Sequence, residues 1–339
     1  MKKITLFSIC LFGLITMAHA QNIITVDNSP GSAAQFSDLQ SAISQAQNGD
    51  IIYVHPSETN YGNINIDKPL TLIGFSHSSP DKETLITDLV FGPLASNVTI
   101  RGIHLTDDLI ISNTGVTLEN IVLENNRLDD SLTFGGGGVN NITVRGNIID
   151  TFGFGSTANS TFTNALITNN IVFGGVNVLF HESTTIKNNI FLTADVFNGR
   201  DETGNIEVQN CIFIGNTSGT ANFNDDGILF QNCLAFNIGS GNATPLVGTD
   251  NLENIDPLFV EDNDNVIFEA TIDDYNLQQG SIARGAGISG EDLGLFDGSG
   301  FVFDNFGFTN GIPTVNIQAI STSVAPGQSL NVIINTSNQ

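Results

Sequence analysis

The sequence predicts an all-β protein: a parallel β-helix with a capping helix before it and a short β tail after it. The first observation is a phrase that recurs between residues 97 and 236: an apolar residue, a polar residue, Asn or Gly, then an apolar run. Its seven copies begin 18 to 26 residues apart, at Ile100, Leu118, Val144, Ile167, Ile186, Val208 and Phe230. A period of about 22 residues is typical of solenoids, in which each repeat forms one coil.

The second observation is the spacing of apolar residues within each repeat. Segments such as Val116–Glu119 and Ile206–Gln209 alternate apolar and polar residues, which is the two-residue period of a strand with one buried face. The regular leucine pattern of leucine-rich repeats is missing, and no 3.6-residue apolar period appears inside the repeat. Gly, Asn, Asp and Ser separate the segments, so we expect two or three short strands per coil.

The third position of the phrase supplies the third observation. Five copies have an asparagine there, at Asn120, Asn169, Asn188, Asn210 and Asn232. Strands of successive coils lie about 4.8 Å apart, so these side chains are predicted to stack at one turn and to hydrogen-bond one another. Asparagine also tolerates the left-handed backbone that such a tight turn needs.

Residues 1–20 have the pattern of a signal peptide. Lys2 and Lys3 precede an apolar core from Ile4 to Met17, and Ala18-His-Ala20 matches a small-residue cleavage site. The apolar stretch is too short to span a membrane stably. We therefore expect no membrane insertion, and export of the chain from Gln21 onward to the periplasm, the cell surface or the medium.

One helix is predicted, over residues 36–47, where Ser37 and Gln40 fit a capping box and Gly49 follows the end. Its apolar face would cover the open edge of the first coil. We expect residues 21–74 to form this cap and the first strands, residues 75–298 the β-helix, and residues 299–339 a tail. Within the tail, Val315–Ile317 and Leu330–Ile334 predict two strands of a partial sandwich-like addition.

Both ends of the predicted β-helix carry motifs of a known superfamily. The opening Phe36-Ser-Asp-Leu-Gln and Lys68-Pro-Leu-Thr-Leu-Ile-Gly74, with the closing Asp256-Pro-Leu-Phe259 and Asp292-Leu-Gly294, resemble secreted bacterial β-helix proteins of the pectin-lyase-like superfamily. The resemblance spans about residues 36–298. It implies a right-handed parallel β-helix, and a site on the outer face of one sheet and its bordering loops. It assigns no activity, because the superfamily contains lyases, hydrolases, esterases and non-catalytic surface proteins.

The chain is strongly acidic, with 35 Asp and Glu residues against 10 Lys and Arg residues and a formal net charge of −25. This charge disfavours nucleic acid and anionic membrane surfaces as partners. It also disfavours polyanionic polysaccharides unless cations bridge the two surfaces. Calcium prefers such oxygen ligands, so it is the cofactor that the composition permits.

Two cysteines, Cys211 and Cys233, follow the signal peptide and occupy the same phase of successive coils. A spacing of about 4.8 Å lies within the Cα separation that a disulfide accepts. Stacked free thiols are the alternative, because a buried cysteine behaves as a small hydrophobe. The sequence leaves both states open.

Three loops that follow predicted strands hold ionisable residues that stacking would bring to one edge. They are His181 and Glu182, then Arg200, Asp201 and Glu202, then Asp225 and Asp226. The carboxylates Asp201, Glu202, Asp225 and Asp226 would bind calcium. His181 and Arg200 are the candidates for proton transfer, with Glu182 contacting the substrate. The competing interpretation is a solvated edge of an acidic solenoid.

A second cluster, Arg145, Thr168 and Lys187, should stack on the outer side of another sheet. Lys187 is a candidate cationic base for a lyase, and Arg145 a candidate substrate ligand; ordinary surface charge is the alternative. His55, His77 and His104 stand alone in strand or turn settings, which indicates structural roles.

Catalytic motifs of the resembling superfamily's pectin-degrading members are missing, and the chain has no Trp for stacking on sugars. The leading hypothesis is therefore an exported acidic β-helix that binds extracellular polysaccharide, cell-surface glycan or other surface partners. The alternatives are a polysaccharide lyase or glycoside hydrolase that uses the His181, Arg200 and Asp225 edge with calcium, and a structural or adhesive spacer. The sequence does not define the oligomeric state.

Overall fold

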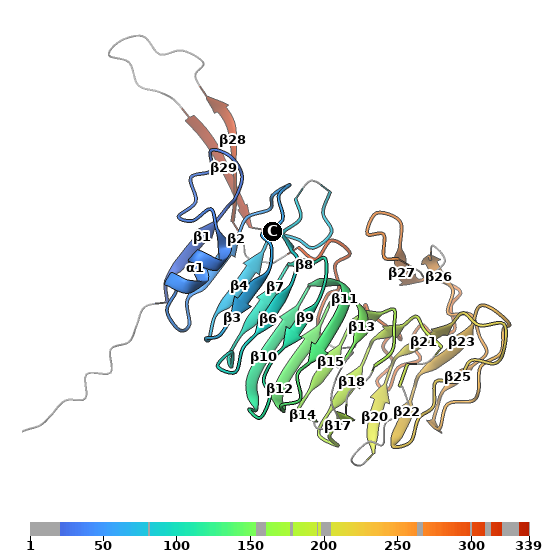
Figure 1. Ribbon diagram of the computed structural model, residues 1–339. Coiled ribbons are helices and arrows are strands. Elements are labelled where there is room, and N and C mark those ends of the chain that lie inside the picture. The colour runs from blue at the N-terminus through green and yellow to red at the C-terminus, as the bar shows by residue number, and fades with distance from the viewer. Residues whose placement is uncertain are drawn as a thin grey trace, which may run out of the picture.

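The computed structural model of the protein describes residues 21–80, 82–153, 161–176, 179–194, 196–197, 205–262, 267–298, 300–308, 313–320 and 332–338. The predicted signal peptide lies outside these residues. Two long parallel sheets, wound at about 22 residues per turn, confirm the β-helix (Figure 1). No helix among the described residues is long and apolar enough to cross a membrane.

The first sheet has the strand order β1 (Ile23–Val26), β2 (Ile51–Val54), β4 (Thr71–Gly74), β7 (Thr99–Arg101), β10 (Leu118–Glu124), β12 (Val139–Arg145), β15 (Leu166–Thr168), β18 (Thr185–Lys187), β20 (Ile206–Gln209), β22 (Ile228–Gln231) and β24 (Gly248–Thr249). β14 (Thr161–Thr163) and β17 (Leu179–Phe180) branch from β12. Neighbouring strands of this sheet pair in parallel, so each strand of the main path begins a new coil.

The second sheet has the order β3 (Ile64–Ile66), β6 (Leu89–Phe91), β9 (Leu109–Ile111), β11 (Arg127–Phe134), β13 (Ile148–Phe152), β16 (Ile171–Val172), β19 (Ile190–Phe191), β21 (Ile212–Gly215), β23 (Leu234–Asn237) and β25 (Leu252–Glu253). β5 (Leu85–Ile86) and β8 (His104–Leu105) join it beside β11. Two antiparallel pairs lie outside these sheets: β26 (Phe259–Glu261) with β27 (Asp274–Leu277), and β28 (Pro313–Ile320) with β29 (Val332–Asn338). The last pair contains the two strands predicted for the tail.

The strand register corrects one repeat. Leu123, and not Leu118, pairs with Ile100 on one side and Val144 on the other. The prediction was wrong there because β10 begins with Leu118-Glu-Asn and ends with Leu123-Glu, followed by Asn125, so the strand offers two similar starting points. With Leu123 in place the repeats begin 19 to 23 residues apart, so the chain is more regular than the sequence alone indicated.

The hydrogen-bonded asparagine ladder lies one residue beyond the predicted position. The backbone N–H groups of Asn126, Asn147 and Asn170 donate to the side-chain oxygens of Asn147, Asn170 and Asn189, at 2.9, 2.9 and 3.0 Å. The side-chain amides repeat the same links at 3.0, 3.0 and 2.9 Å. All four asparagines are fully buried, so the ladder satisfies polar groups that would otherwise lack partners.

Free thiols continue this ladder. Cys211 and Cys233 are both buried and unbonded to each other through sulfur. The Cys211 sulfur accepts the Asn189 N–H at 3.4 Å, and the Cys233 sulfur accepts the Cys211 N–H at 3.5 Å. Each thiol therefore occupies the place of an asparagine oxygen, and burial raises the pKa of Cys233 well above its ordinary value.

The predicted stack of Asn169, Asn188, Asn210 and Asn232 is correct in its backbone and wrong in its side-chain partners. All four have left-handed φ angles between 51° and 56°. Three of their side-chain amides donate to a segment from the far end of the chain: Asn169 to Leu295 O, Asn210 to Glu291 Oε1 and Asn232 to Ala286 O. Asn120 belongs to a different corner, where its amide donates to Asn97 at 2.9 Å.

That segment, residues 283–298 and 300–308, is called the return segment because it runs back along the solenoid. It ends where the Phe306 carbonyl accepts the N–H groups of His77 and Ser78, each at 3.2 Å. On the way it packs on the outer face of the second sheet, whose residues Ile148, Ile171, Ile190, Ile212 and Leu234 form a second core with Leu293, Leu295 and Phe303. The solenoid thus has one core inside and one outside.

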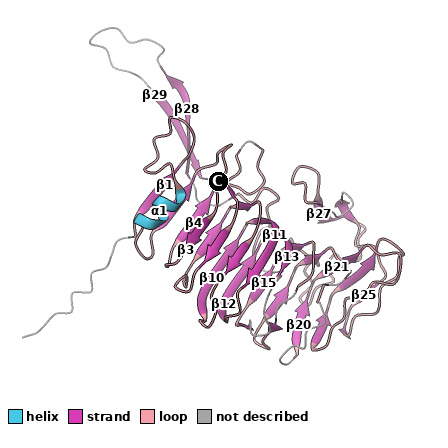
Figure 2. Ribbon diagram, viewed as in Figure 1, coloured by secondary structure: helices cyan, strands magenta, loops and turns pink. Residues whose placement is uncertain are grey.

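The N-terminal end is covered by α1 (Leu39–Gln45), beside β1 (Figure 2). The helix is shorter than predicted, and its N-cap is Asp38 rather than Ser37, with the Asp38 carboxylate accepting the Ser41 N–H at 2.7 Å. Leu39, Ala42 and Ile43 face the interior, which confirms the predicted covering role.

Candidate functional site

One row of outward-facing residues on the second sheet changes character along the solenoid. In the register of β8, β11, β13 and β16, His104 pairs with Arg127, Arg127 with Ile148, and Ile148 with Ile171. From Ile148 onward the row is apolar and lies under the return segment and its neighbours. The first two positions are ionisable, so the covered face ends beside a polar network.

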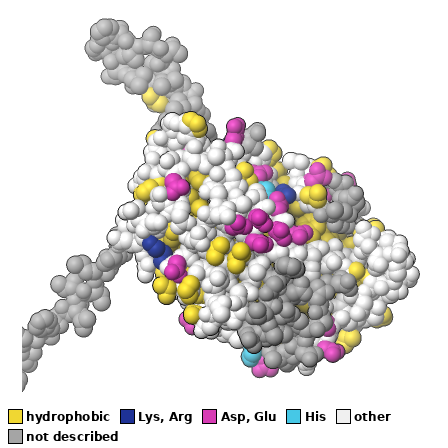
Figure 3. Space-filling view, in the orientation of Figure 1, with side chains coloured by type: hydrophobic (Ala, Val, Ile, Leu, Met, Phe, Trp, Pro, Cys, Tyr) yellow, Lys and Arg dark blue, Asp and Glu magenta, His cyan; other side chains and the backbone are white. Residues whose placement is uncertain are grey.

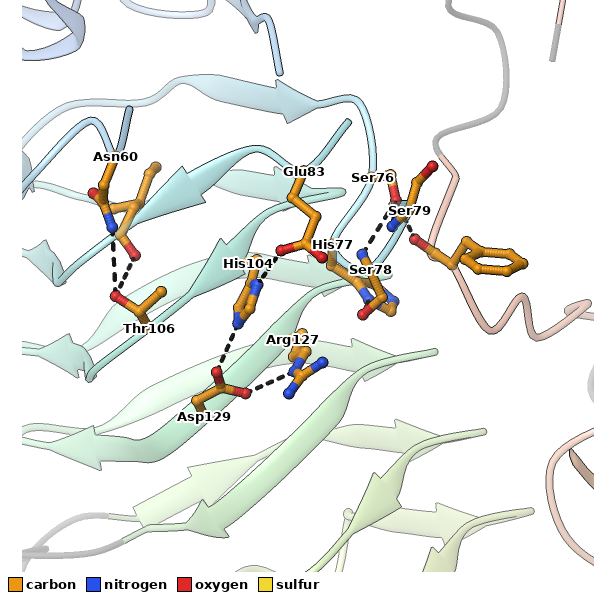
Figure 4. A network of polar contacts seen from close by, with 12 residues as sticks. Asn60, Ser76, His77, Ser78, Ser79, Glu83, His104, Thr106, Arg127 and Asp129 are labelled. Atoms are coloured by element: carbon orange, nitrogen blue, oxygen red, sulfur yellow. Dashed lines mark hydrogen bonds and ion pairs between the residues drawn. The ribbon is translucent and has the colours of Figure 1, made fainter. Parts of the chain in front are cut away.

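His104 is the centre of that network. It is 8% exposed; its Nδ1 lies 2.8 Å from Glu83 Oε2 and its Nε2 lies 2.7 Å from Asp129 Oδ2. Arg127 Nε donates to the other Asp129 oxygen at 2.6 Å (Figure 4). The expectation that His104 stands alone is therefore wrong, because two carboxylates bind its ring.

These contacts shift the pKa values of His104 and Asp129 in opposite directions. Burial opposes a charged imidazole, but the hydrogen bonds that its ring N–H groups donate to Asp129 and Glu83 outweigh it and raise the pKa of His104 above 6.5. Burial also opposes a charged Asp129, but the hydrogen bond and charge of His104, with the charge of Arg127, lower the pKa of that carboxyl. His104 thus gains a positive charge more readily than an ordinary histidine and holds it between two anions.

A bulge in β11 places two carboxylates at the surface. The pairing of β11 with β13 shifts between Leu128 and Ser131, and the unpaired residues there are Asp129 and Asp130. A bulge of this kind redirects side chains out of the regular alternation. Both aspartates are exposed, while Leu128 and Ser131 on either side are buried.

Beside the network lies a cavity of about 260 Å³, here called the Asp150 cavity. It combines one cation and two anions with apolar walls, lined by Arg127, Leu128, Asp129, Ile148, Asp150, Phe173, Ile267 and Phe268. Burial, followed by the nearby charges of Asp130 and Asp129, raises the pKa of Asp150. The cavity therefore holds two carboxyls whose pKa values are displaced in opposite directions.

Further carboxylates lie beyond the cavity, in the bulge of β11 and just before β9 and β6. This acidic shelf consists of Asp88, Asp107, Asp108 and Asp130. Oxygens of Asp107, Asp108 and Asp130 lie within 4.8 Å of one another, close enough to hold one cation. Burial and the charges of Asp130, Asp107 and Asp88 raise the pKa of Asp108. Figure 3 shows acidic side chains gathered on this face, bordered by a histidine and a basic side chain.

His77 lies behind the network and has a structural role, as predicted. It is fully buried, and its Nδ1 lies 2.8 Å from the Ser78 hydroxyl. Burial, followed by the charges of His104 and Arg127, lowers the pKa of His77 well below 6.5. Gly307 of the return segment lies against this ring so closely that a side chain at position 307 would overlap it.

The predicted edge is only partly described. His181 and Glu182 line a separate hollow of about 630 Å³ with Glu207, Gln209 and Leu229. His181 Nδ1 lies 3.0 Å from the Ser183 hydroxyl, and no carboxylate bonds it among the residues that the structure describes. Arg200, Asp201 and Glu202 lie outside those residues.

Asp225 and Asp226 lie in the turn before β22, where an Asp225 oxygen accepts the Asp226 N–H at 2.9 Å. Calcium binding by Asp201, Glu202, Asp225 and Asp226 stays a prediction.

The second predicted cluster is aligned as expected. Arg145, Thr168 and Lys187 occupy one register row of the first sheet, with Gln209 next. Arg145 pairs with Glu124, and its guanidinium lies 5.3 Å from the centre of the Phe301 ring. Arg145 therefore anchors the return segment to the solenoid. Lys187 lies on the outer face between Thr168 and Gln209.

Sequence reasoning missed the network at His104 because of the misplaced repeat at Leu118. With Leu123 aligned to Ile100, the residues four positions on are Arg127 and His104, which shows them to be neighbours. The paired aspartates at 129 and 130, in a strand that otherwise alternates, would then have indicated an outward bulge beside them.

Comparison of the sequence with known proteins does not assign the chain to a family. No protein-family model matches the chain, and no curated protein matches it. The fold and the site geometry therefore carry the functional argument.

Proposed function

We propose that this protein is an exported β-helix that binds extracellular or cell-surface saccharides in the Asp150 cavity. The parallel β-helix fold is consistent with carbohydrate-binding and surface roles. The motifs at residues 36–74 and 256–294 resemble the pectin-lyase-like superfamily, and we propose that relationship on those motifs alone.

The cavity is the observation that carries the proposal. Its polar groups converge from adjacent strands, with Arg127 and Asp129 from β11 and Asp150 from β13. Its apolar walls include two phenylalanine rings, Phe173 and Phe268. Saccharides present hydroxyl groups at their edges and C–H groups on their ring faces, so they need both kinds of lining.

The size of the cavity limits what enters it. About 260 Å³ lies just below the roughly 300–1,000 Å³ of sites that enclose a drug-sized ligand. One sugar unit therefore enters, and neighbouring units lie along the sheet. Arg127 is held in place by Asp129, which reduces the entropy lost when it binds a hydroxyl group.

Calorimetric titration of the chain from Gln21 with neutral and charged oligosaccharides tests the proposal. Asp150→Asn should weaken binding at least tenfold, because a hydrogen bond to a charged group contributes about 1.5–3 kcal/mol. Phe268→Ala should weaken it comparably. Glu119→Gln, an exposed change on β10, is the matched control. The proposal fails if no saccharide binds, or if Asp150→Asn binds as tightly as the unaltered protein.

One observation favours a second function, glycoside hydrolysis in the same cavity. Asp129 has a lowered pKa and Asp150 a raised pKa, for the causes given above. Two carboxyls with pKa values displaced in opposite directions are the pattern in which one acts as a base or nucleophile and the other as an acid. In this function Asp150 donates a proton to the leaving oxygen as the glycosidic bond breaks and water attacks the anomeric carbon. The ionised Asp129, beside His104, accepts the proton that the water gives up.

Release of reducing ends from saccharides that bind is the test for hydrolysis. Asp150→Asn and Asp129→Asn should each lower the rate at least a hundredfold at saturating substrate. If a bound saccharide stays intact through prolonged incubation, hydrolysis is excluded and binding remains.

A further inference from the structure

Charge pairing around the Asp150 cavity leaves an excess of negative charge on the side of Asp150 and the acidic shelf. Glu83 and Asp129 face His104 and Arg127, so those four groups balance. Among the described residues, the ion pairs of the solenoid do not include Asp150. The ion pairs of the described residues do not include Asp130 or Asp108 either, the shelf carboxylates next to Asp150.

The excess negative charge lies both inside the cavity and on the surface beside it. Asp150 lines the cavity, and Asp130 stands in the bulge between the cavity and the rest of the shelf. The charges of Asp130 and Asp129 both act on Asp150, and that of Asp130 acts on Asp108. A ligand with one positive group in the cavity therefore removes repulsion among several carboxylates at once.

We propose that the Asp150 cavity and the acidic shelf select saccharides that carry protonated amino groups, such as oligomers of glucosamine. The inference rests on the proposed function, since it names the class of saccharide that the cavity takes. An ammonium group supplies three N–H donors, and Asp150 and Asp130 supply acceptors. Phe173 and Phe268 take the apolar face of the same sugar ring.

The overall charge of the protein works in the same direction. A net charge of −25 attracts a cationic polymer over a distance set by salt and repels uronic acid polymers. Acetylation of the amine removes the positive charge and keeps the ring. An amino saccharide and its N-acetylated counterpart therefore differ in the positive charge to which the shelf responds.

Affinities of the chain from Gln21 for a glucosamine tetramer and for the N-acetylglucosamine tetramer give the test. We expect the amine form to bind at least tenfold more tightly below the pKa of its amino groups. The difference should shrink in roughly 0.5 M salt and above that pKa, because screening and deprotonation both remove the charge attraction. Equal affinities below that pKa would overturn the inference, while binding of neither tetramer nor of any other saccharide would overturn the proposed function itself.

Variants locate the selectivity. Asp130→Asn should lower the ratio of the two affinities about threefold, a change of about 0.6 kcal/mol that lies within the range for one charge contact at a surface. Glu119→Gln removes the same charge elsewhere and should keep the ratio. An equal loss in both variants would mean attraction by net charge alone, and overturn the assignment to the shelf. So would full displacement of the amine form by millimolar calcium or by a simple diamine, which would indicate a general cation site. Unfolding midpoints of both variants confirm that they are folded.

Discussion

The outward face of the second sheet has two halves that share one backbone register and differ in chemistry. From Ile148 to Leu234 the residues are buried and apolar under the return segment, whereas His104 and Arg127 form ion pairs at the edge of a cavity. The apolar half contributes stability through burial. The polar half contains carboxylates that repel one another, and this repulsion reduces the stability of the fold. The solenoid thus supports a site on one half because the other half is covered.

The largest expected effect comes from placing a charge in the apolar half. Ile190→Asp would put a carboxylate at a fully buried position of the outer core, and should lower the free energy of unfolding by about 3–5 kcal/mol. Denaturant unfolding measures this loss. Val302→Asp is the control on the return segment, because Val302 is 81% exposed and the change should stay within about 0.5 kcal/mol. Similar losses in both variants would contradict the assignment of this face to a core.

The next effect concerns the bond between His104 and Asp129. Asp129→Asn removes a charge-assisted acceptor from a buried ring, so we expect a loss of about 1–2 kcal/mol in the free energy of unfolding. The pKa of His104, followed by NMR titration, should fall. Asp107→Asn, in which the removed carboxylate does not touch His104, should leave that pKa nearly unchanged. An unchanged pKa in Asp129→Asn would mean that Glu83 alone sets it.

The pH dependence of stability follows from the raised pKa of His104. A folded pKa above the unfolded value means that the stabilisation is complete below about pH 6.5 and is lost as pH rises through the folded pKa. The loss amounts to about 1.4 kcal/mol for every pH unit that separates the folded pKa from the unfolded one. Denaturant midpoints from pH 6.5 upward should fall in the unaltered protein relative to His104→Gln. Parallel curves for the two proteins would refute the ion pairs.

Below about pH 6.5, a second histidine makes stability change with pH in the opposite direction. The pKa of His77 is lowered by burial, so unfolding exposes a ring that takes up a proton. Stability that depends on neutral His77 is therefore lost as pH falls below about 6.5. The two histidines can be separated because their contributions occupy different sides of that value.

The smallest expected effect is a gain in stability. Asp150→Asn removes a carboxylate that its neighbours repel, and should raise the free energy of unfolding by a few tenths of a kcal/mol after solvent screening. The same variant should bind saccharide more weakly. A stabilised protein with reduced binding would show that the polar half gives up stability for function. A destabilised variant would mean that Asp150 has a favourable partner in solution.

Much of the fold follows from the sequence, because period and alternation are local properties. The β-helix, its covering helix, the left-handed asparagine corner and the two tail strands were all predictable. The side-chain partners of Asn169, Asn210 and Asn232 were not, because they lie on a segment 54 to 126 residues away. No local pattern encodes such a contact.

The candidate site was harder to predict for a related reason. A displacement of five residues, from Leu123 to Leu118, was enough to separate His104 from Arg127 in the sequence alignment of the repeats. The predicted row of Arg145, Thr168 and Lys187 was correct, because its repeats were correctly aligned. In a solenoid, register decides which side chains meet, so an error in one repeat hides a whole site.

The return segment also bears on how the protein is made. The Ser76 hydroxyl donates to the Phe306 carbonyl across 230 residues of sequence, and the outer core closes only when that segment arrives. Until then a growing chain carries a stripe of isoleucine and leucine side chains open to water along coils already formed. Such a chain is prone to association during synthesis and benefits from a chaperone. The return segment is therefore synthesised after the coils, and its arrival covers the stripe through which the growing chain would associate.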